Sequence, residues 1–409
     1  MNKKLLALAV AGALASPLAA QAQTANVTMY GTFRLALEST DLKDVGRSNH
    51  VDSWSSRWGI RGVESIGGGL NGIFQLETGV NLDSPGGAVV DFAGSSVRYQ
   101  VITIREAWVG LNGGFGTIKM GSGLTPYDDV LGMDHLLLAN GFEGLTTLGG
   151  GTQNTISRSG NFTNMGATGA ASVSNTSGSA CGGGNMTNWD ARYGSSFRYD
   201  SPSFSGLTFA TQFAFLGENS TGFKCKGWDS AVIYANGPIE LGLTYARHID
   251  FQSYDGNAWR GHAAYNFGFL KVLGAYERMS YDSNNAGNTG GTSTGSAKAR
   301  YYSIGAQLPL GPGTLNAQYH NRDKGVAVGA TVVGFTATGA NISTPASTIT
   351  EIDEGGGKAY SVSYMYGFSK RTYLFGFAAR VKAENAARIE GGPFGGTATS
   401  VGFGVRHNF

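Results

Sequence analysis

The last residues of the chain alternate strictly between apolar and polar positions. Between residues 401 and 409 the even positions are Gly, Gly, Arg and Asn, and the odd positions are Val401, Phe403, Val405, His407 and Phe409. This period of two predicts a β-strand with one apolar face. A soluble sheet rarely ends on such an edge because an unpaired edge promotes aggregation, whereas a closed barrel has no edge. We therefore predict the closing strand of a membrane barrel, whose assembly signal is formed by Phe403, Val405, His407 and Phe409.

Segments of similar length and alternation recur along the whole chain from residue 27 onward. Short Gly- and Pro-rich turns, such as 113–116 and 310–313, alternate with long polar loops, such as 284–296 and 326–357. Counting strands between these connections predicts an all-β fold, an antiparallel transmembrane barrel of about 16 strands with both termini on the short-turn side. A soluble β-sandwich is the alternative, but a meander of so many strands would then need short loops at both ends.

The alternation also assigns each side chain to the lipid or to the lumen. In the first strand Val27 and Met29 are expected to face lipid, while Tyr30 and Arg34 face the lumen. Further lipid-facing stripes are predicted at Leu241/Leu243/Tyr245, Tyr360/Val362/Tyr364/Tyr366 and Phe375/Phe377. Tyr and Phe near strand ends are typical of interfacial girdles.

The N-terminus predicts export. Lys3 and Lys4 precede an apolar run over 5–14, and a small-residue cleavage site ends at Ala22. We expect a cleaved signal peptide at 1–22 and an outer-membrane barrel at 23–409, because the run is too short for a membrane anchor.

Composition removes several classes of protein. The chain has 409 residues and 65 Gly, and no apolar run beyond the predicted leader approaches the roughly 18 residues that a membrane helix needs. Lys and Arg number 30 against 28 Asp and Glu, so no bulk positive field indicates a nucleic-acid partner. The electrostatics that matter must therefore be local.

Several motifs, in order, resemble general diffusion porins of Gram-negative beta-proteobacteria. They include Val27-Thr-Met-Tyr-Gly31, Ser56-Arg-Trp-Gly-Ile-Arg-Gly-Val-Glu64, Arg105-Glu-Ala-Trp-Val-Gly-Leu111 and Gly404-Val-Arg-His-Asn-Phe409. The resemblance covers essentially the whole mature chain. It implies a homotrimer of 16-stranded barrels in outer-membrane lipid and lipopolysaccharide, each with an inward-folded third extracellular loop that narrows a pore for small hydrophilic solutes and ions.

Charged residues on the lumen face form the candidate pore constriction. Alternation points the guanidinium groups inward, and the family's constriction arginines match Arg57 and Arg105. The predicted cations are Arg57, Arg61, Arg105, Arg192 and Arg198, and the predicted counter-charges are Glu77 on the wall and Asp128, Asp129 and Asp134 on the long loop. The excess of arginine predicts a modest anion preference. The simpler interpretation is that an inward arginine, above all Arg34 or Lys119, only wets the lumen.

The third long loop is expected to begin at Leu124-Thr-Pro-Tyr-Asp-Asp129, which resembles the family's inward-folded segment. A Gly/Ser/Asn-rich insertion makes the loop long, and the excess could either constrict the pore or lie outside. Cys181 in this loop and Cys225 in the next are predicted to form a disulfide, because neighbouring loops emerge side by side in an oxidising compartment. The Gly-rich approach to Cys181 leaves open that this cysteine stays mobile.

Other chemistry has little support in the sequence. The pattern Gly291-Thr-Ser-Thr-Gly295 lies in a low-complexity loop, and six His lack metal-ligand spacing, so we expect no enzyme activity, cofactor or metal. Two channel hypotheses remain, a passive porin and a substrate-specific channel with a saturable binding site, with a non-conducting adhesin as a distant third. Linear flux, saturable flux and absent conductance would distinguish them.

Overall fold

The computed structural model describes residues 26–83, 89–92, 95–98, 102–133, 136, 189, 192–215, 226–251, 254–283, 296–323, 326–328, 352–353, 357–383 and 396–409. The expected signal peptide lies outside these ranges, as do Asp134, Cys181 and Cys225, so the disulfide stays a prediction. Within the described part of the chain, no helix combines the length and apolar character needed to cross a bilayer.

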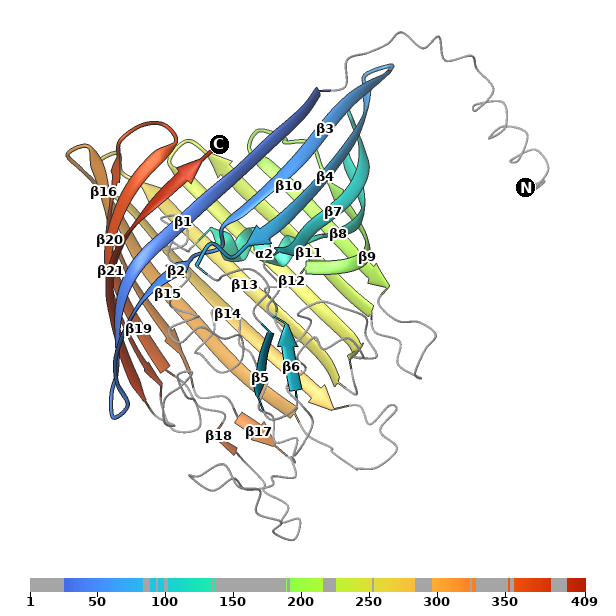
Figure 1. The fold of residues 1–409 in the computed structure, drawn as a ribbon. Helices are drawn as coiled ribbons and strands as arrows, with labels where there is room; N and C mark the ends of the chain where they lie inside the picture. The colour runs from blue at the N-terminus through green and yellow to red at the C-terminus, as the bar shows by residue number, and fades with distance from the viewer. Residues whose placement is uncertain are drawn as a thin grey trace.

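A closed antiparallel barrel of 16 strands forms the molecule (Figure 1). Its strands are β1 (Asn26–Leu42), β3 (Arg57–Gly67), β4 (Leu70–Val80), β7 (Ile102–Gly113), β8 (Gly116–Leu124), β9 (Arg192–Asp200), β10 (Leu207–Phe215), β11 (Lys226–Asn236), β12 (Ile239–Phe251), β13 (Tyr254–Asn266), β14 (Lys271–Ser283), β15 (Ser296–Leu310), β16 (Gly313–Arg322), β19 (Gly357–Gly367), β20 (Thr372–Ala383) and β21 (Thr397–Asn408). The predicted fold class and strand number are confirmed.

The barrel closes between the first and last strands. β21 pairs with β1 from Thr32↔Asn408 to Leu42↔Ala398. Beyond the strand, the amide of Phe409 donates to the carbonyl of Gly31 at 3.1 Å and the amide of Gly31 donates back at 3.0 Å. Figure 1 shows both strand ends at the short-turn rim. The alternating C-terminal segment is therefore the closing strand, with Phe403 and Val405 exposed on the outer face.

Five short strands lie outside this count. β2 (Gly46–Ser53) continues the hairpin from β1 and pairs with its second half, from Leu35↔Ser53 to Leu42↔Gly46. β5 (Val89–Phe92) and β6 (Ser95–Arg98) pair with each other, and β17 (Val326–Val328) and β18 (Ile352–Asp353) extend the edge beside β15. Ser55, with a φ of 45°, interrupts the extended backbone between β2 and β3.

The outer face is apolar at most predicted positions, but one predicted stripe points the other way. Leu241, Leu243 and Tyr360 are exposed on the outer face, whereas Phe375 and Phe377 are buried inside the barrel. The aromatic rings of Phe375 and Phe377 lie against Trp54, and a Cβ on Gly402 or Gly404 would collide with them. The prediction of lipid contact for this pair was wrong because glycines on β21 make room for large rings on the inner face.

The short helix α2 (Pro126–Gly132) begins directly after β8. Thr125 caps it by accepting a hydrogen bond from the amide of Asp128, and Pro126 occupies the first turn, where its missing N–H costs nothing. Residues of α2 contact β10, β11, β12 and β13, and Figure 1 shows the helix inside the barrel. The start of the third long loop therefore lies within the lumen.

Candidate pore constriction

The first part of the candidate site is a row of inward side chains on adjacent strands. β3 pairs with β1 as Thr32↔Arg57 and Thr28↔Arg61, and Thr32 is buried on the inner face, so Arg57 and Arg61 share that face. On the next strand Glu77 lies opposite Gly59. Alternation predicted these positions correctly because β3 and β4 pair regularly over this stretch.

A β-bulge adds Arg105 to the row. Glu77 pairs with Glu106, but the next residue, Thr78, pairs with Ile104, which leaves Arg105 as the extra residue. A bulge re-aims side chains, so Arg105 and Glu106 both point inward. Strict alternation would have placed only one of them in the lumen, and sequence reasoning missed Glu106 for this reason.

Glu77 is shared among three donors. The Nε of Arg105 lies 3.0 Å from Oε1, the Nε of Arg57 lies 3.6 Å from Oε2, and the hydroxyl of Tyr30 donates to Oε2 at 3.1 Å. The guanidinium of Arg61 stands 5.1 Å above the Tyr30 ring. Glu77 is buried, while Arg57 and Arg105 keep 30% and 20% of their side chains exposed. Glu77 thus holds the guanidinium groups of Arg57 and Arg105 in position, while these groups stay partly exposed to the lumen.

Glu106 takes neutral partners instead. Its Oε2 accepts hydrogen bonds from the Nε2 of Gln75 and the Nε1 of Trp108, both at 3.0 Å. Three arginines and two glutamates therefore face the lumen on these strands, an excess of one positive charge. Tyr30, Gln75 and Trp108 are further site residues that charge counting could not find.

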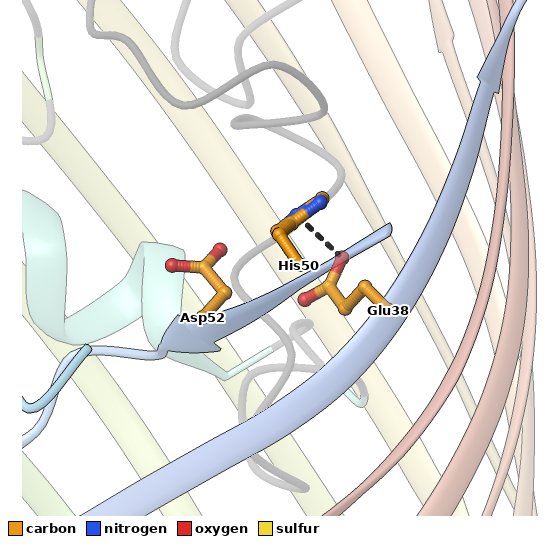
Figure 2. A group of neighbouring side chains, drawn as sticks. All are labelled: Glu38, His50 and Asp52. Carbon is orange, nitrogen blue, oxygen red and sulfur yellow. Dashed lines mark ion pairs between the residues drawn. The ribbon is translucent and has the colours of Figure 1, made fainter. Parts of the chain in front are cut away.

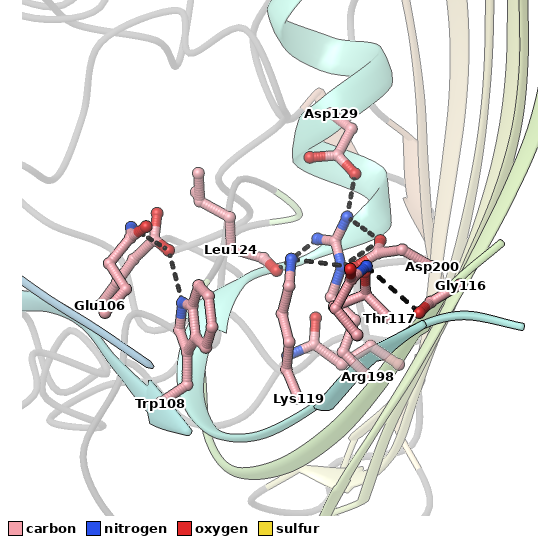
Figure 3. A network of polar contacts seen from close by, with 12 residues as sticks. Glu106, Trp108, Gly116, Thr117, Lys119, Leu124, Asp129, Arg198 and Asp200 are labelled. Carbon is pink, nitrogen blue, oxygen red and sulfur yellow. Dashed lines mark hydrogen bonds and ion pairs between the residues drawn. The ribbon is translucent and has the colours of Figure 1, made fainter. Parts of the chain in front are cut away.

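A second network ties the loop helix to the wall (Figure 3). The Nη2 of Arg198 lies 2.5 Å from Asp129 of α2 and 2.7 Å from Asp200, and its Nη1 donates to the carbonyl of Leu124 at 2.8 Å. Lys119 pairs with Asp200 at 2.9 Å. Burial raises the pKa of the Asp129 carboxyl, and the adjacent Arg198 opposes that rise. Arg198 therefore anchors the loop rather than presenting a free charge.

A cavity of about 160 Å³ lies beside this network. Its polar lining includes Glu106, Trp108, Lys119, Asp129 and Arg198. The Nζ of Lys119 stands 5.0 Å from the centre of the Trp108 ring. The cavity joins the two networks, because Glu106 and Trp108 belong to one and Lys119 and Arg198 to the other.

The apolar side of the loop helix packs against the opposite wall. Tyr127 and Leu131 form a buried cluster with Trp189, Ala258, Met279 and Tyr301. Gly242 on β12 allows this close approach, since a Cβ there would lie 2.9 Å from Val130 and 3.0 Å from Met133. The arginines of β3 and β7 and the helix therefore occupy different walls of the barrel.

The remaining predicted residues are placed less centrally. Arg192 pairs with Leu124 and is followed by Tyr193, whose buried hydroxyl donates to Asp229 inside the barrel. A register shift between Tyr193 and Ser196, where Ser195 has a φ of 44°, separates Arg192 from the inward row of Arg198. Arg192 stays a predicted constriction residue, and its Nε is buried. Asp128 lies in the first turn of α2, where its amide is capped by Thr125.

Comparisons with known proteins place the chain among porins. The family model described as Gram-negative porin matches residues 7–386. An outer membrane porin protein of Bordetella pertussis is 25% identical, and outer membrane porin protein 32 of Delftia acidovorans is 26% identical, each over the full length of both chains. An anion-selective porin from Comamonas acidovorans has a TM-score of 0.62 at 22% identity, covering 94% of this chain and 100% of its own. A trimer form of a Vibrio cholerae outer membrane protein has a TM-score of 0.57 at 15% identity, covering 94% of this chain and 99% of its own.

Proposed function

Because the chain belongs to the Gram-negative porin family and is a channel of the outer membrane, we propose that it conducts small hydrophilic solutes passively with a modest preference for anions. The observation that carries the proposal is the Arg57–Arg61–Arg105 row around Glu77 and Glu106. Guanidinium groups stay charged at any relevant pH, so the lumen keeps its local positive excess. The anion selectivity named for the Comamonas porin agrees with this expectation.

Reversal potentials in a planar bilayer with a KCl gradient test the anion preference. Replacing Arg57 and Arg105 by Gln should shift the potential toward cations, because the local charge then becomes negative. Arg278 of β14 and Arg380 of β20 on the outer face give a matched control, since R278Q/R380Q removes two positive charges away from the lumen. Equal potentials for the wild type and the double variant would contradict the proposal.

A substrate-specific channel is the second candidate, and the cavity beside Trp108 favours it. The two cationic side chains that line this cavity are already paired with carboxylates, Lys119 with Asp200 and Arg198 with Asp129. They therefore add no net charge to the lining. Solute flux into liposomes separates the two candidates: a linear dependence on concentration supports passive diffusion, and saturation that is lost in K119Q supports a binding site.

We also propose a homotrimer assembled through the closure region. The outer face here offers Val27, Met29, Phe403 and Val405, beside the small residues Gly376 and Ala378 of β20. Such a surface can pack against a copy of itself in closed cyclic symmetry. The unheated protein in detergent should therefore migrate at three times the mass of the heated chain, and F403E should reduce that species to the monomer.

Lipopolysaccharide is the proposed lipid partner on the remaining circumference. Several basic residues at the strand ends far from the short turns face outward, among them Arg247, Arg278, Lys298, Arg300, Lys358, Arg380 and Lys382. Aromatic neighbours lie beside them in register, as in Trp259↔Arg278 and Tyr360↔Arg380. Phosphate groups of the outer leaflet would pair with this belt. The R278Q/R380Q variant should retain less lipopolysaccharide phosphate on purification, whereas R57Q should retain the wild-type amount.

A further inference from the structure

Three metal-ligating side chains meet inside the first hairpin, away from the constriction. Glu38 on β1 pairs directly with His50 on β2, and Asp52 follows two positions later on the same face (Figure 2). The Nε2 of His50 lies 3.8 Å from the Oε2 of Glu38. One ligand atom from each of the three residues lies within 4.8 Å of the other two.

Glu38 is held in place but not fully satisfied. The residue is only 5% exposed, and its Oε2 accepts a hydrogen bond from the hydroxyl of Ser400 at 3.3 Å. Its second carboxylate oxygen, Oε1, is buried without a hydrogen-bond partner among the described residues. A buried carboxylate oxygen without a donor is costly, so this atom is suited to a cation.

The surroundings are rich in carboxyl groups. Asp83 contacts the carboxyl of Asp52, so three carboxyl groups gather around one imidazole. The indole N–H of Trp54 is a hydrogen-bond donor to the carboxyl groups of Glu38 and Asp52, but it carries no charge. A divalent cation would draw these carboxyl groups and the imidazole together as ligands.

We infer that Glu38, His50 and Asp52 bind a divalent transition metal ion, with Zn²⁺ as the representative. An imidazole together with carboxylates suits Zn²⁺ better than Ca²⁺ or Mg²⁺, which take oxygen ligands. Ligand atoms on a tetrahedral Zn²⁺ lie about 3.3 Å apart, given metal–ligand bonds of about 2.0–2.1 Å. The side chains of His50 and Asp52 are the more exposed ones, and rotating them closes the remaining gap.

The metal would join the two strands of the first hairpin. Its ligands come from β1, which is paired on its other side with β21, and from β2, which runs into Trp54. Trp54 packs on Phe375 and Phe377 across the barrel closure. Binding would therefore hold β2 to β1, independently of the ion selectivity proposed above.

Calorimetric titration of the metal-free, detergent-purified protein with ZnCl₂ tests this inference. We expect one site per chain, and we expect H50Q and E38Q each to weaken the site at least about tenfold. The matched control is D41N on the same hairpin, because Asp41 pairs with Arg47 on the surface and its replacement should leave the affinity unchanged.

Spectroscopy with Co²⁺ in place of Zn²⁺ gives a second measurement. A d–d absorption band that appears in the wild type and D41N but disappears in H50Q supports an imidazole ligand. The absence of a Zn²⁺ site in the wild type, equal affinity in H50Q, or a site that prefers Ca²⁺ over Zn²⁺ would each overturn the inference. The unheated mobility of each variant on a gel verifies that its barrel is folded.

Discussion

The Arg57–Glu77–Arg105 group and the Arg260–Glu277 pair use the same chemistry in opposite surroundings. Arg260 and Glu277 face each other directly on β13 and β14, and both side chains are fully buried. The guanidinium of Arg260 stands 5.2 Å from the centre of the Tyr301 ring. The Glu77 group, by contrast, keeps its arginines partly exposed.

The loop helix accounts for this difference. Ala258 and Met279 flank the buried pair on the same inner face, and both contact the cluster of Tyr127, Leu131 and Trp189. Among the described residues, the main contacts of α2 are with β10 to β13, whereas Arg57 lies on β3 and Arg105 on β7. Burial converts one ion pair into a structural element, while exposure leaves the other available to passing ions.

The largest effect is expected from E277Q. Removing the carboxylate leaves the Arg260 charge buried and uncompensated, which should lower the free energy of unfolding by about 3–5 kcal/mol. Urea unfolding in lipid vesicles measures this change. Replacing both partners, as in R260M/E277L, should recover most of the loss, and a double variant as unstable as E277Q would show that the pair itself supplies the stability.

Displacing α2 from the wall at β12 should have the next largest effect. G242L would push Val130 and Met133 away from β12, at a cost of about 1–3 kcal/mol, and would displace α2 toward the lumen. We expect a lower single-channel conductance because the helix then obstructs more of the pore. Gly261 on the neighbouring strand has open space at its Cβ position, so G261A should conduct like the wild type.

In the exposed group, E77Q should change selectivity more than stability. Arg57 and Arg105 lose their shared counter-charge, so the local excess rises and the reversal potential should move further toward anions. The shift should shrink from 0.1 M to 1 M salt, because the screening length falls from about 10 Å to about 3 Å. A shift that is independent of salt would indicate a rearranged pore instead of a changed field.

Which side chains of the exposed group face the lumen could largely be predicted from the sequence, but the irregularities of strand register could not. Alternation placed Arg57, Arg61 and Glu77 correctly because the strands are regular there. It failed at Glu106, where a bulge shifts the register, and at Phe375, where opposing glycines accept the ring.

Spatial pairing across strands was equally hidden from the sequence. Nothing in the spacing links Arg260 to Glu277 or Glu38 to His50, since each pair forms only through strand register. Burial by the loop depends on tertiary packing of α2, which a period of two cannot encode.

The smallest effect is expected at the most exposed ion pair, which completes the series. Arg47 and Asp41 lie 3.3 Å apart with 66% and 49% of their side chains exposed. Solvent screens such a pair, and holding two long side chains together costs entropy, so R47Q should lower the stability by less than about 1 kcal/mol. The reversal potential of R47Q should equal that of the wild type, because the Arg47–Asp41 pair lies on the outer face of the first hairpin. If R47Q destabilised the barrel as much as E277Q, burial could not be what separates the two kinds of ion pair.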